Sequence, residues 1–205
     1  MNDAAKPSRA ENKQSKRQAI LEALASELEQ NPGERITTAR LAAGLGVSEA
    51  ALYRHFPSKA RMFEGLIEFA EDTVFGLIRR IMDDEKEALA RCEKIIALLL
   101  GFSAKNPGIT SVLVGVALTG ETERLRQRVS QFFDRLETQF RQILRERELT
   151  LTQAGGRPVN ETANLLLSIV EGHMQQFVRS GYRQSPLSGW EQQWPLIAQL
   201  LRAYQ

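Results

Sequence analysis

The sequence predicts an all-α protein made of a small N-terminal three-helix unit and a larger C-terminal helical unit. Apolar residues recur every three to four positions along most of the chain, which is the spacing of helices that bury one face. Strands would need runs of alternating apolar and polar residues bounded by turn residues, and we find none. Turn-forming clusters at residues 31–33, 106–108 and 155–156 separate the helical stretches.

The composition is that of an ordinary globular protein. The 205 residues are 42% hydrophobic and 25% charged, with a formal net charge of +2. The single cysteine, Cys92, excludes an intrachain disulfide framework, and its apolar helical surroundings predict a buried side chain. The longest apolar run, residues 95–102, is too short to cross a bilayer, and the N-terminus lacks an apolar signal core. We therefore expect a cytoplasmic protein.

The N-terminal unit begins with a polar stretch. Residues 1–12 are expected to form a disordered basic arm. The basic side chains here and just beyond outnumber the single acid, Glu11, and fit either a solvated tail or an arm along DNA phosphates. Beside a DNA-binding motif we favour the second interpretation. These side chains are Lys6, Arg9, Lys13, Lys16 and Arg17.

Residues 13–57 have the pattern of a helix-turn-helix domain. Helices are expected at 13–29, 39–45 and 48–55, with Thr37 or Thr38 capping the second, Ser48 capping the third and Pro57 ending it. Gly46 is placed where the backbone must adopt a left-handed turn. The third helix of such a unit can enter the major groove. The apolar residues expected to form its small core are Leu41, Ala42, Leu45, Val47, Leu52 and Phe56.

Polar residues around this motif are candidates for DNA contact. Hydroxyl groups can donate to phosphates, and Arg54, His55 and Lys59 add positive charge. Base reading is expected from the first turn of the third helix and from Arg54, with alanine offering only methyl contacts. The residues that we predict to contact DNA are Arg35, Thr37, Thr38, Ser48, Glu49, Ala50, Ala51, Tyr53, Arg54, His55 and Lys59.

Residues 58–205 are expected to form a dimerisation and partner-binding domain. Helices are predicted at 58–83, 85–104, 110–118, 121–147, 161–180 and 189–203, with a loop at 153–158. The helices at 121–147 and 161–180 can pair with their copies as a four-helix bundle, although a deep single-chain core is the alternative. The residues predicted to contact the second copy are Leu165, Leu166, Ile169, Val170, His173 and Phe177.

We find no pattern of an enzyme, a metal site or a cofactor site. No set of nucleophile, base and acid is apparent. The acidic run at residues 83–85 fits capping charge at a helix junction better than metal binding, and the glycines at 44 and 46 lack a third partner for a nucleotide loop. We therefore expect no catalysis, no metal and no cofactor.

The motif resembles the signature of the TetR family of regulators. The resemblance is carried by residues 36–38 and by residues 46–59, which read Gly-Val-Ser-Glu-Ala-Ala-Leu-Tyr-Arg-His-Phe-Pro-Ser-Lys. One departure is Ala50, where many members have glycine. The resemblance implies a TetR-like fold and sequence-specific DNA binding as a dimer on palindromic sites, with several dimers on one site as a further possibility.

Further segments resemble a subgroup of that family whose members bind DNA and antagonise the division protein FtsZ, so that the septum does not close over the chromosome. They include residues 61–63, 66–69, 98–102, 106–108, 171–172, 177–180 and 194–197. The resemblance implies a groove between the helices at 58–83 and 85–104 that takes the C-terminal tail of FtsZ. The residues to which it assigns this role are Phe69, Leu98, Gly101, Lys105 and Asn106.

The leading hypothesis is therefore a nucleoid-associated, DNA-activated inhibitor of FtsZ assembly. The first alternative is a ligand-responsive transcriptional repressor, which requires a ligand-sized cavity among the C-terminal helices. The second is a helical binding module without a DNA function. Helical periodicity itself leaves open whether Phe69 is an exposed anchor or a contact with a neighbouring helix.

Overall fold

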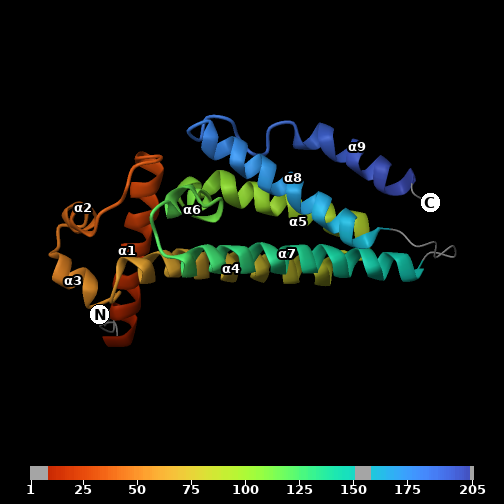
Figure 1. Ribbon diagram of the computed structural model, residues 1–205. Coiled ribbons are helices and arrows are strands. Elements are labelled where there is room, and N and C mark those ends of the chain that lie inside the picture. Colours follow the sequence, from red (N-terminus) through yellow and green to blue (C-terminus); the bar gives the residue numbers. More distant parts are fainter. Residues whose placement is uncertain (1–8, 151–157, 204–205) are drawn as a thin grey trace, which may run out of the picture.

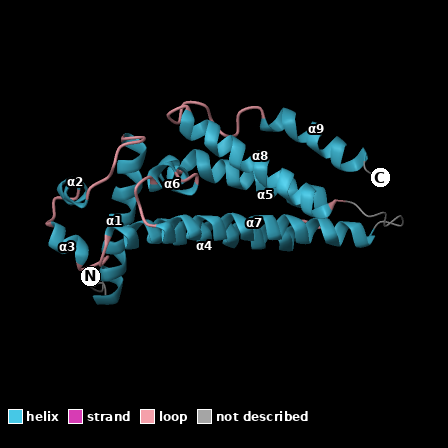
Figure 2. Ribbon diagram, in the orientation of Figure 1, coloured by secondary structure: helices cyan, strands magenta, loops and turns pink. Residues whose placement is uncertain are grey.

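The computed structural model describes residues 9–150 and 158–203, and this part of the chain consists of helices and loops without a strand (Figure 2). The predicted all-α class is confirmed. The elements are α1 (Arg9–Gln30), α2 (Thr38–Gly44), α3 (Glu49–Tyr53), α4 (Lys59–Asp84), α5 (Ala88–Lys105), α6 (Pro107–Leu113), the 3-10 helix η1 (Val116–Leu118), α7 (Glu123–Thr150), α8 (Val159–Arg179) and α9 (Trp190–Ala203).

The helices form a head and a body. In Figure 1, α1 lies across one end of the long helices, and α2 and α3 pack on its outer side. We call α1–α3 the head and α4–α9 the body. Helices α4, α5, α7 and α8 pack against one another, with α4 and α7 running away from the head and α5 and α8 running back toward it; α9 runs away from the head again and packs on α5.

Local hydrogen bonds explain where the short helices of the head begin. The side chains of Thr37 and Ser48 accept hydrogen bonds from the backbone N–H groups of Arg40 and Ala51, and Ser58 caps α4 in the same way. Gly46 has a φ of 65°, as its place in the turn requires. Both the caps and the left-handed glycine confirm the sequence-based expectation.

One apolar core runs through head and body. In the head it contains Leu24, Leu41, Leu52 and Phe56, but Val47, which we expected there, is exposed. In the body, the apolar stripe of α7 faces α4, α5 and α8 of its own chain and is fully or nearly fully buried. This stripe consists of Leu125, Val129, Phe132, Leu136, Phe140 and Ile143.

The head is held to the body by a close helix crossing. Helices α1 and α6 cross so closely that a Cβ built on Gly108 lies 2.0 Å from the carbonyl oxygen of Ala25. No side chain fits there, so glycine is required by space rather than by φ.

Ion pairs between α4 and α7 join two helices within the body. The buried carboxylates of Glu64 and Glu71, both on α4, face arginines of α7. Breaking such a pair leaves a buried charge without compensation, so these contacts resist rotation of α4 against α7. The pairs are Glu64 with Arg124 at 3.0 Å and Glu71 with Arg128 at 2.6 Å.

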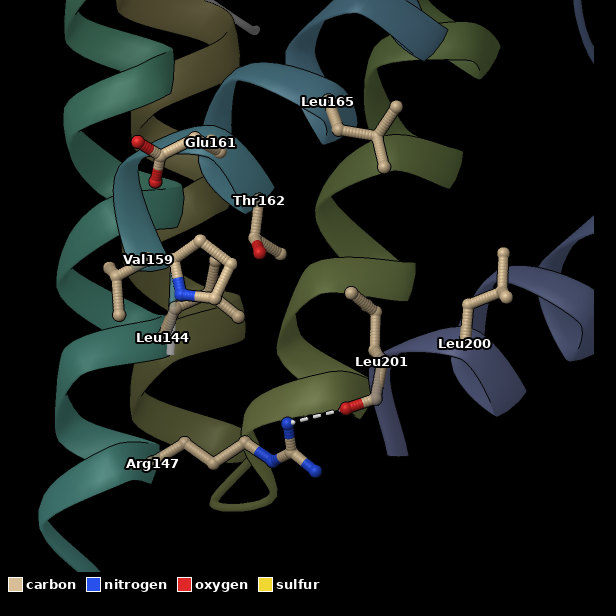
Figure 3. A pocket seen from close by; sticks show the side chains of 9 residues that line it. Leu144, Arg147, Val159, Glu161, Thr162, Leu165, Leu200 and Leu201 are labelled. Atoms are coloured by element: carbon tan, nitrogen blue, oxygen red, sulfur yellow. Dashed lines mark hydrogen bonds between the residues drawn. The ribbon is translucent and has the colours of Figure 1, made fainter. Parts of the chain in front are cut away.

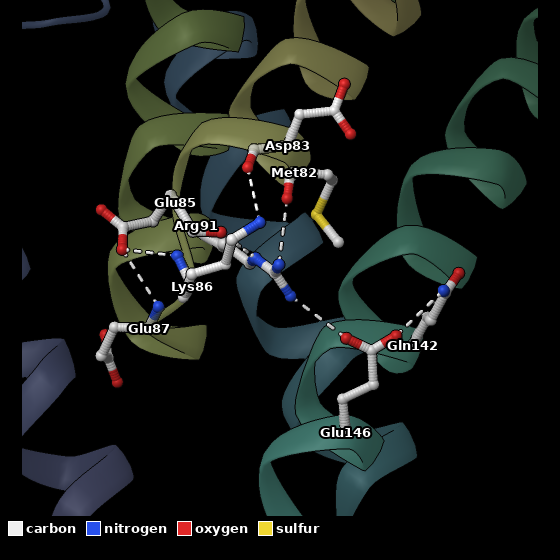
Figure 4. A network of polar contacts seen from close by, with 8 residues as sticks. All are labelled: Met82, Asp83, Glu85, Lys86, Glu87, Arg91, Gln142 and Glu146. Atoms are coloured by element: carbon white, nitrogen blue, oxygen red, sulfur yellow. Dashed lines mark hydrogen bonds and ion pairs between the residues drawn. The ribbon is translucent and has the colours of Figure 1, made fainter.

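A second polar network closes the far end of the α4–α5 hairpin (Figure 4). Arg91 donates to the carbonyl oxygens of Met82 and Glu85, which end α4, and pairs with Glu146 of α7 at 3.1 Å. A hydrogen bond from Lys94 and two backbone N–H donors lower the pKa of Glu85 to about 2. The acidic run at 83–85 is thus part of a helix junction. Within the described ranges, no group of three or more His, Cys, Asp or Glu is arranged to hold a metal ion.

Two details differ from the expectations, and a third expectation falls mostly outside the described residues. Helix α1 begins at Arg9 rather than Lys13, so residues 9–12 of the expected arm are helical, whereas residues 1–8, with Lys6, lie outside the described residues. The helix expected at 110–118 starts at Pro107 and is broken at Gly115, whose φ is 81°, so that only η1 follows. Most of the loop expected at 153–158 also lies outside the described residues.

Candidate nucleic-acid and protein interfaces

The outer face of α2 and α3 carries a connected set of polar side chains. The hydroxyl of Thr38 donates to the carboxylate of Glu49 at 2.5 Å, and the hydroxyl of Tyr53 donates to Thr38 at 3.3 Å. These contacts link the two helices and orient Glu49 in the first turn of α3. Ala50 and Arg54 are exposed beside them. The structure thus brings together most residues that we predicted to contact DNA.

The capping residues remain able to contact a phosphate. Thr37 and Ser48 use their hydroxyl oxygens as acceptors for backbone N–H groups at 3.2 and 3.3 Å. A hydroxyl that accepts a hydrogen bond still has a proton to donate. The two residues therefore position the helices and present a donor at the same time. Arg35 is exposed just before α2.

Two predicted DNA contacts are instead directed toward the protein. The Lys59 ammonium lies 2.5 Å from the carboxylate of Glu121 and 5.5 Å from the ring centre of Phe63, so it joins α4 to the turn that precedes α7. His55 packs against α1 beside a cavity of about 270 Å³, and its Nδ1 is buried without a partner among the described residues. The sequence pattern could not reveal this, because both partner segments are distant along the chain.

Basic residues of α1 gather near the C-terminal end of α3. Burial and the charges of Lys16, Lys13, Arg17 and Arg54 lower the pKa of His55, which places these cations around the imidazole. Arg17 stacks 4.1 Å from the ring centre of Phe56 and donates to the carbonyl oxygen of His55 at 2.6 Å, so it fastens α1 to α3. Lys13 and Lys16 are exposed and remain available to an anionic partner.

The residues assigned to a partner tail lie on α4 and α5. Phe69 is 37% exposed although most of its neighbours on α4 are buried. Leu98 is half-buried, and a Cβ on Gly101 would meet no atom within 4 Å. Phe69 and Gly101 both lie roughly 20 Å from the α4–α5 turn, at about 1.5 Å of rise per residue, so they are level on adjacent antiparallel helices.

The polar members of this set end α5. Lys105 is exposed in the last turn. The amide of Asn106 donates from Nδ2 to the carbonyl oxygen of Phe102 at 2.8 Å, which caps the helix and leaves its Oδ1 as an acceptor. A peptide lying between α4 and α5 would meet an aromatic ring, an open backbone and then a positive charge.

Three of the six predicted dimer contacts are covered by their own chain. Leu166, Val170 and Phe177 are buried inside their own chain, and His173 is half-buried, with Nδ1 2.7 Å from the carbonyl oxygen of Pro186. Ile169 is also half-buried, so only Leu165 among the six is exposed. The six residues cover too wide an arc of α8 for one outer face, and the inner part of that arc packs on α5, α6 and α7.

Sequence reasoning missed the leucines of α9. Leu196 and Leu200 are more than half exposed and lie four residues apart, hence on one face of the helix. Leu200 and Leu165 line the same apolar cavity of about 290 Å³, together with Leu144 and Val159 (Figure 3). The signal in the sequence was the periodicity of α9, which shows an apolar stripe but not which part of it the body leaves uncovered.

Two further cavities lie between helices at the surface of the described part of the chain. One of about 410 Å³ lies between α4 and α7 and is lined by Phe75, Arg79 and Arg135. Another, of about 310 Å³, lies between α6, α7 and α8 and contains Glu171, whose pKa is raised by burial and by Glu137. No single described helix is long and apolar enough to cross a membrane, and the bent pair α5 and α6, which passes that test jointly, has mostly buried side chains.

Comparison with known proteins agrees with this geometry. Residues 20–66 match the family described as bacterial regulatory proteins, tetR family, and residues 86–202 match the SlmA-like family described as tetracyclin repressor-like, C-terminal domain. The chain is 55% identical to the nucleoid occlusion factor SlmA of Shewanella amazonensis over 94% of this chain and 98% of that protein. It is 54% identical to the SlmA protein of Idiomarina loihiensis, with the same coverage.

Among solved structures, the fatty acid degradation regulator FadR of Bacillus halodurans superimposes with a TM-score of 0.76 over 94% of this chain and 96% of that one, at 12% identity. A TetR regulator from Haloarcula marismortui gives a TM-score of 0.73 at 17% identity, over 91% of this chain and 98% of that one. At these identities the likeness concerns the fold alone. The matched families consist of regulatory proteins rather than enzymes. The chain therefore belongs to the TetR family of bacterial regulatory proteins and, within it, to the SlmA proteins.

Proposed function

We propose that this protein is a nucleoid occlusion factor, a dimeric DNA-binding protein that antagonises FtsZ assembly when it is bound to the chromosome. The observation that carries the proposal is identity of 51–56% to nucleoid occlusion factors over more than nine-tenths of the chain. The proposal assigns DNA binding to residues 13–57 and dimerisation and partner binding to residues 58–205. It places the protein in the cytoplasm, on the nucleoid.

DNA binding is assigned to the outer face of the head. Helix α3 enters the major groove, where Glu49, Ala50 and Arg54 meet base edges, while Thr37, Thr38, Ser48 and Tyr53 donate to phosphates. Exposed Lys13 and Lys16 extend the positive surface along α1. Lys59 and His55 are left out of this set, because their side chains are held by Glu121 and by α1.

Dimerisation is assigned to the outer faces of α8 and α9. The exposed leucines Leu165, Leu196 and Leu200 provide an apolar surface that water would otherwise cover. Two copies related by a two-fold axis bury this surface and point their heads in the same direction, as palindromic sites require.

The FtsZ tail is assigned to the surface of Phe69, Leu98, Gly101, Lys105 and Asn106. An exposed aromatic ring is the kind of anchor that dominates small interfaces. The open space over Gly101 lets a peptide backbone approach, and Lys105 pairs with a carboxylate of the tail. This surface lies on the half of the body nearer the head, because Phe69 is in the first half of α4 and Leu98, Gly101, Lys105 and Asn106 are at the end of α5.

The test is FtsZ sedimentation with GTP, with and without a duplex that the protein selects from random sequences. We expect the mass of pelleted polymer to fall only when the protein and its duplex are both present. Phe69→Ala should abolish this inhibition while DNA affinity stays within twofold. Leu77→Ala, which removes a similarly exposed apolar side chain from the same helix, is the matched control and should inhibit like the wild type.

Unchanged polymer mass with wild-type protein and DNA would refute FtsZ antagonism. Normal inhibition by Phe69→Ala would refute the assigned surface alone. A map of chromosomal occupancy separates the proposal from a ligand-responsive repressor: nucleoid occlusion requires sites scattered over the chromosome but sparse near its terminus, whereas a repressor requires a site beside a neighbouring operon.

A further inference from the structure

The turn after α8 contains a residue in an unusual backbone conformation. Gly181 and Tyr182 have φ values of 63° and 64°, and Tyr182 is the one non-glycine residue with positive φ in the described part of the chain. Bulky residues rarely adopt this region, where glycine or asparagine fits without cost. A tyrosine held there indicates that its side chain is needed where this backbone places it.

The side chain of Tyr182 reaches from the body to the head. Its hydroxyl donates to the carbonyl oxygen of Leu28 in α1 at 3.3 Å, and its ring packs 5.3 Å from that of Phe177. Ser111 of α6 lies beside the phenol, whose pKa is raised by burial, so the hydroxyl keeps its proton near neutral pH. Figure 1 shows the turn after α8 beside the C-terminal end of α1.

The carbonyl group that Tyr182 contacts lacks its partner within α1. In an α-helix the carbonyl of Leu28 would accept from the N–H of residue 32. That residue is Pro32, which has no N–H. The neighbouring carbonyl, that of Glu27, is satisfied by the backbone N–H and the side-chain amide of Asn31. Proline therefore leaves an acceptor at the end of α1, and Tyr182 supplies the donor from another part of the fold.

The contact between Tyr182 and Leu28 lies between the proposed DNA-binding face of the head and the proposed dimer surface of α9. The relative position of these two surfaces decides how a dimer meets DNA. Helix α2 packs on α1, α3 packs on α2, and Arg17 of α1 holds the residues that follow α3. The segment with Tyr182 leads directly into α9, which carries the exposed Leu196 and Leu200. A change in the angle of α1 on the body would change the distance between the two α3 helices of a dimer.

We propose that Tyr182 is a positioning residue that fixes the angle of the head on the body and thereby sets the half-site spacing that the dimer reads. The inference rests on the proposed DNA-binding function. Tyr182 contacts no DNA itself. It acts through Leu28 by holding the C-terminal end of α1, and the α1–α6 crossing at Gly108 holds α1 about one turn earlier, at Ala25.

The test compares Tyr182→Phe with the wild type on three duplexes: the palindrome that the wild type selects, the same palindrome with one base pair inserted at its centre, and a single half-site. Tyr182→Phe removes only the hydroxyl and keeps the ring against Phe177. We expect half-site affinity within twofold of wild type, because the reading face is unchanged. Affinity for the selected palindrome should fall about fivefold, the typical effect of one lost hydrogen bond.

The decisive quantity is the ratio of the affinities for the selected and the expanded palindrome. It should fall at least threefold in Tyr182→Phe, because a loosened head tolerates the wrong spacing. Gln184→Ala, an exposed neighbour in the same turn, is the control and should keep the wild-type ratio. A wild-type ratio in Tyr182→Phe would overturn the inference, and so would an equal loss on the half-site, since a folding defect weakens every duplex alike.

Hydrogen exchange tests the same contact without DNA. The backbone amides of residues 27–36 should exchange at least threefold faster in Tyr182→Phe than in the wild type or in Gln184→Ala. Unchanged exchange would overturn the role of Tyr182. Failure of the wild type to bind any duplex would count against the proposed function instead, and the exchange result would still decide whether Tyr182 holds α1.

Discussion

Replacing Gly108 with alanine should destabilise the protein far more than a single methyl group suggests. The new Cβ would lie 2.0 Å from the carbonyl oxygen of Ala25, where ordinary contact needs more than 3 Å, and that oxygen belongs to backbone that no rotamer change can move. Helices α1 and α6 must separate. Overpacking in a core costs about 1–3 kcal/mol of stability. Because the new methyl group would clash with backbone rather than with a flexible side chain, we expect a cost near the upper end of this range.

For a chain of this length, 1 kcal/mol corresponds to a change in melting temperature of roughly 2–4 °C. A loss of about 3 kcal/mol should therefore lower the melting temperature of Gly108→Ala by roughly 6–12 °C in a circular dichroism melt. The control is Gly76→Ala in α4, where the nearest atom to a new Cβ is the flexible Nη2 of Arg79 at 3.8 Å. It should melt at or above the wild-type temperature, since alanine favours a helix. A Gly108→Ala variant that melts within about 2 °C of wild type would refute the close crossing.

Three further predictions follow from burial and charge. Leu200→Glu should shift the protein from dimer to monomer in analytical ultracentrifugation. The control Leu149→Glu, at a site 86% exposed on α7, should remain dimeric. A dimeric Leu200→Glu variant would exclude α9 from the interface. Burial raises the pKa of the Cys92 thiol to about 12, so the native protein should not react with Ellman's reagent at pH 8 until it is denatured, and rapid labelling of folded protein would contradict its burial. Because burial and surrounding cations lower the pKa of His55, the unfolded chain binds a proton near pH 6.5 that the folded chain does not. The free energy of unfolding should therefore fall as the pH drops through that value. A similar dependence on pH in His55→Gln would assign the effect to other groups.

Much of the helical framework could be predicted because its signals are local. Thr37, Ser48 and Ser58 cap helices through hydrogen bonds to N–H groups three residues later, so the sequence window that specifies each contact is short. Gly46 adopts its left-handed turn for an equally local reason. The limits of the long helices and the all-α class follow from periodicity and from the turn residues between helices.

The sequence was least informative about whether a side chain of the predicted site is exposed to solvent or contacts a distant segment of the chain. Lys59 and His55 follow α3 and were predicted to contact DNA, but Lys59 pairs with Glu121 and His55 packs against α1. The apolar stripe of α8 was predicted to contact a second copy, but its residues Leu166, Val170 and Phe177 are buried against other helices of their own chain. Composition and spacing do not show whether such a side chain contacts its own chain or remains available to DNA or a second copy.

By itself, the sequence determined the helices, their caps and the polar face of α3 that we propose contacts DNA, because each depends on residues within one or two turns. Only the tertiary structure decided which apolar residues remain for a second copy, why Gly108 tolerates no side chain, and how Tyr182 reaches the unsatisfied carbonyl of Leu28 across 154 positions of sequence. These contacts depend on where whole helices cross, and that is set by the packing of the entire core rather than by any local pattern.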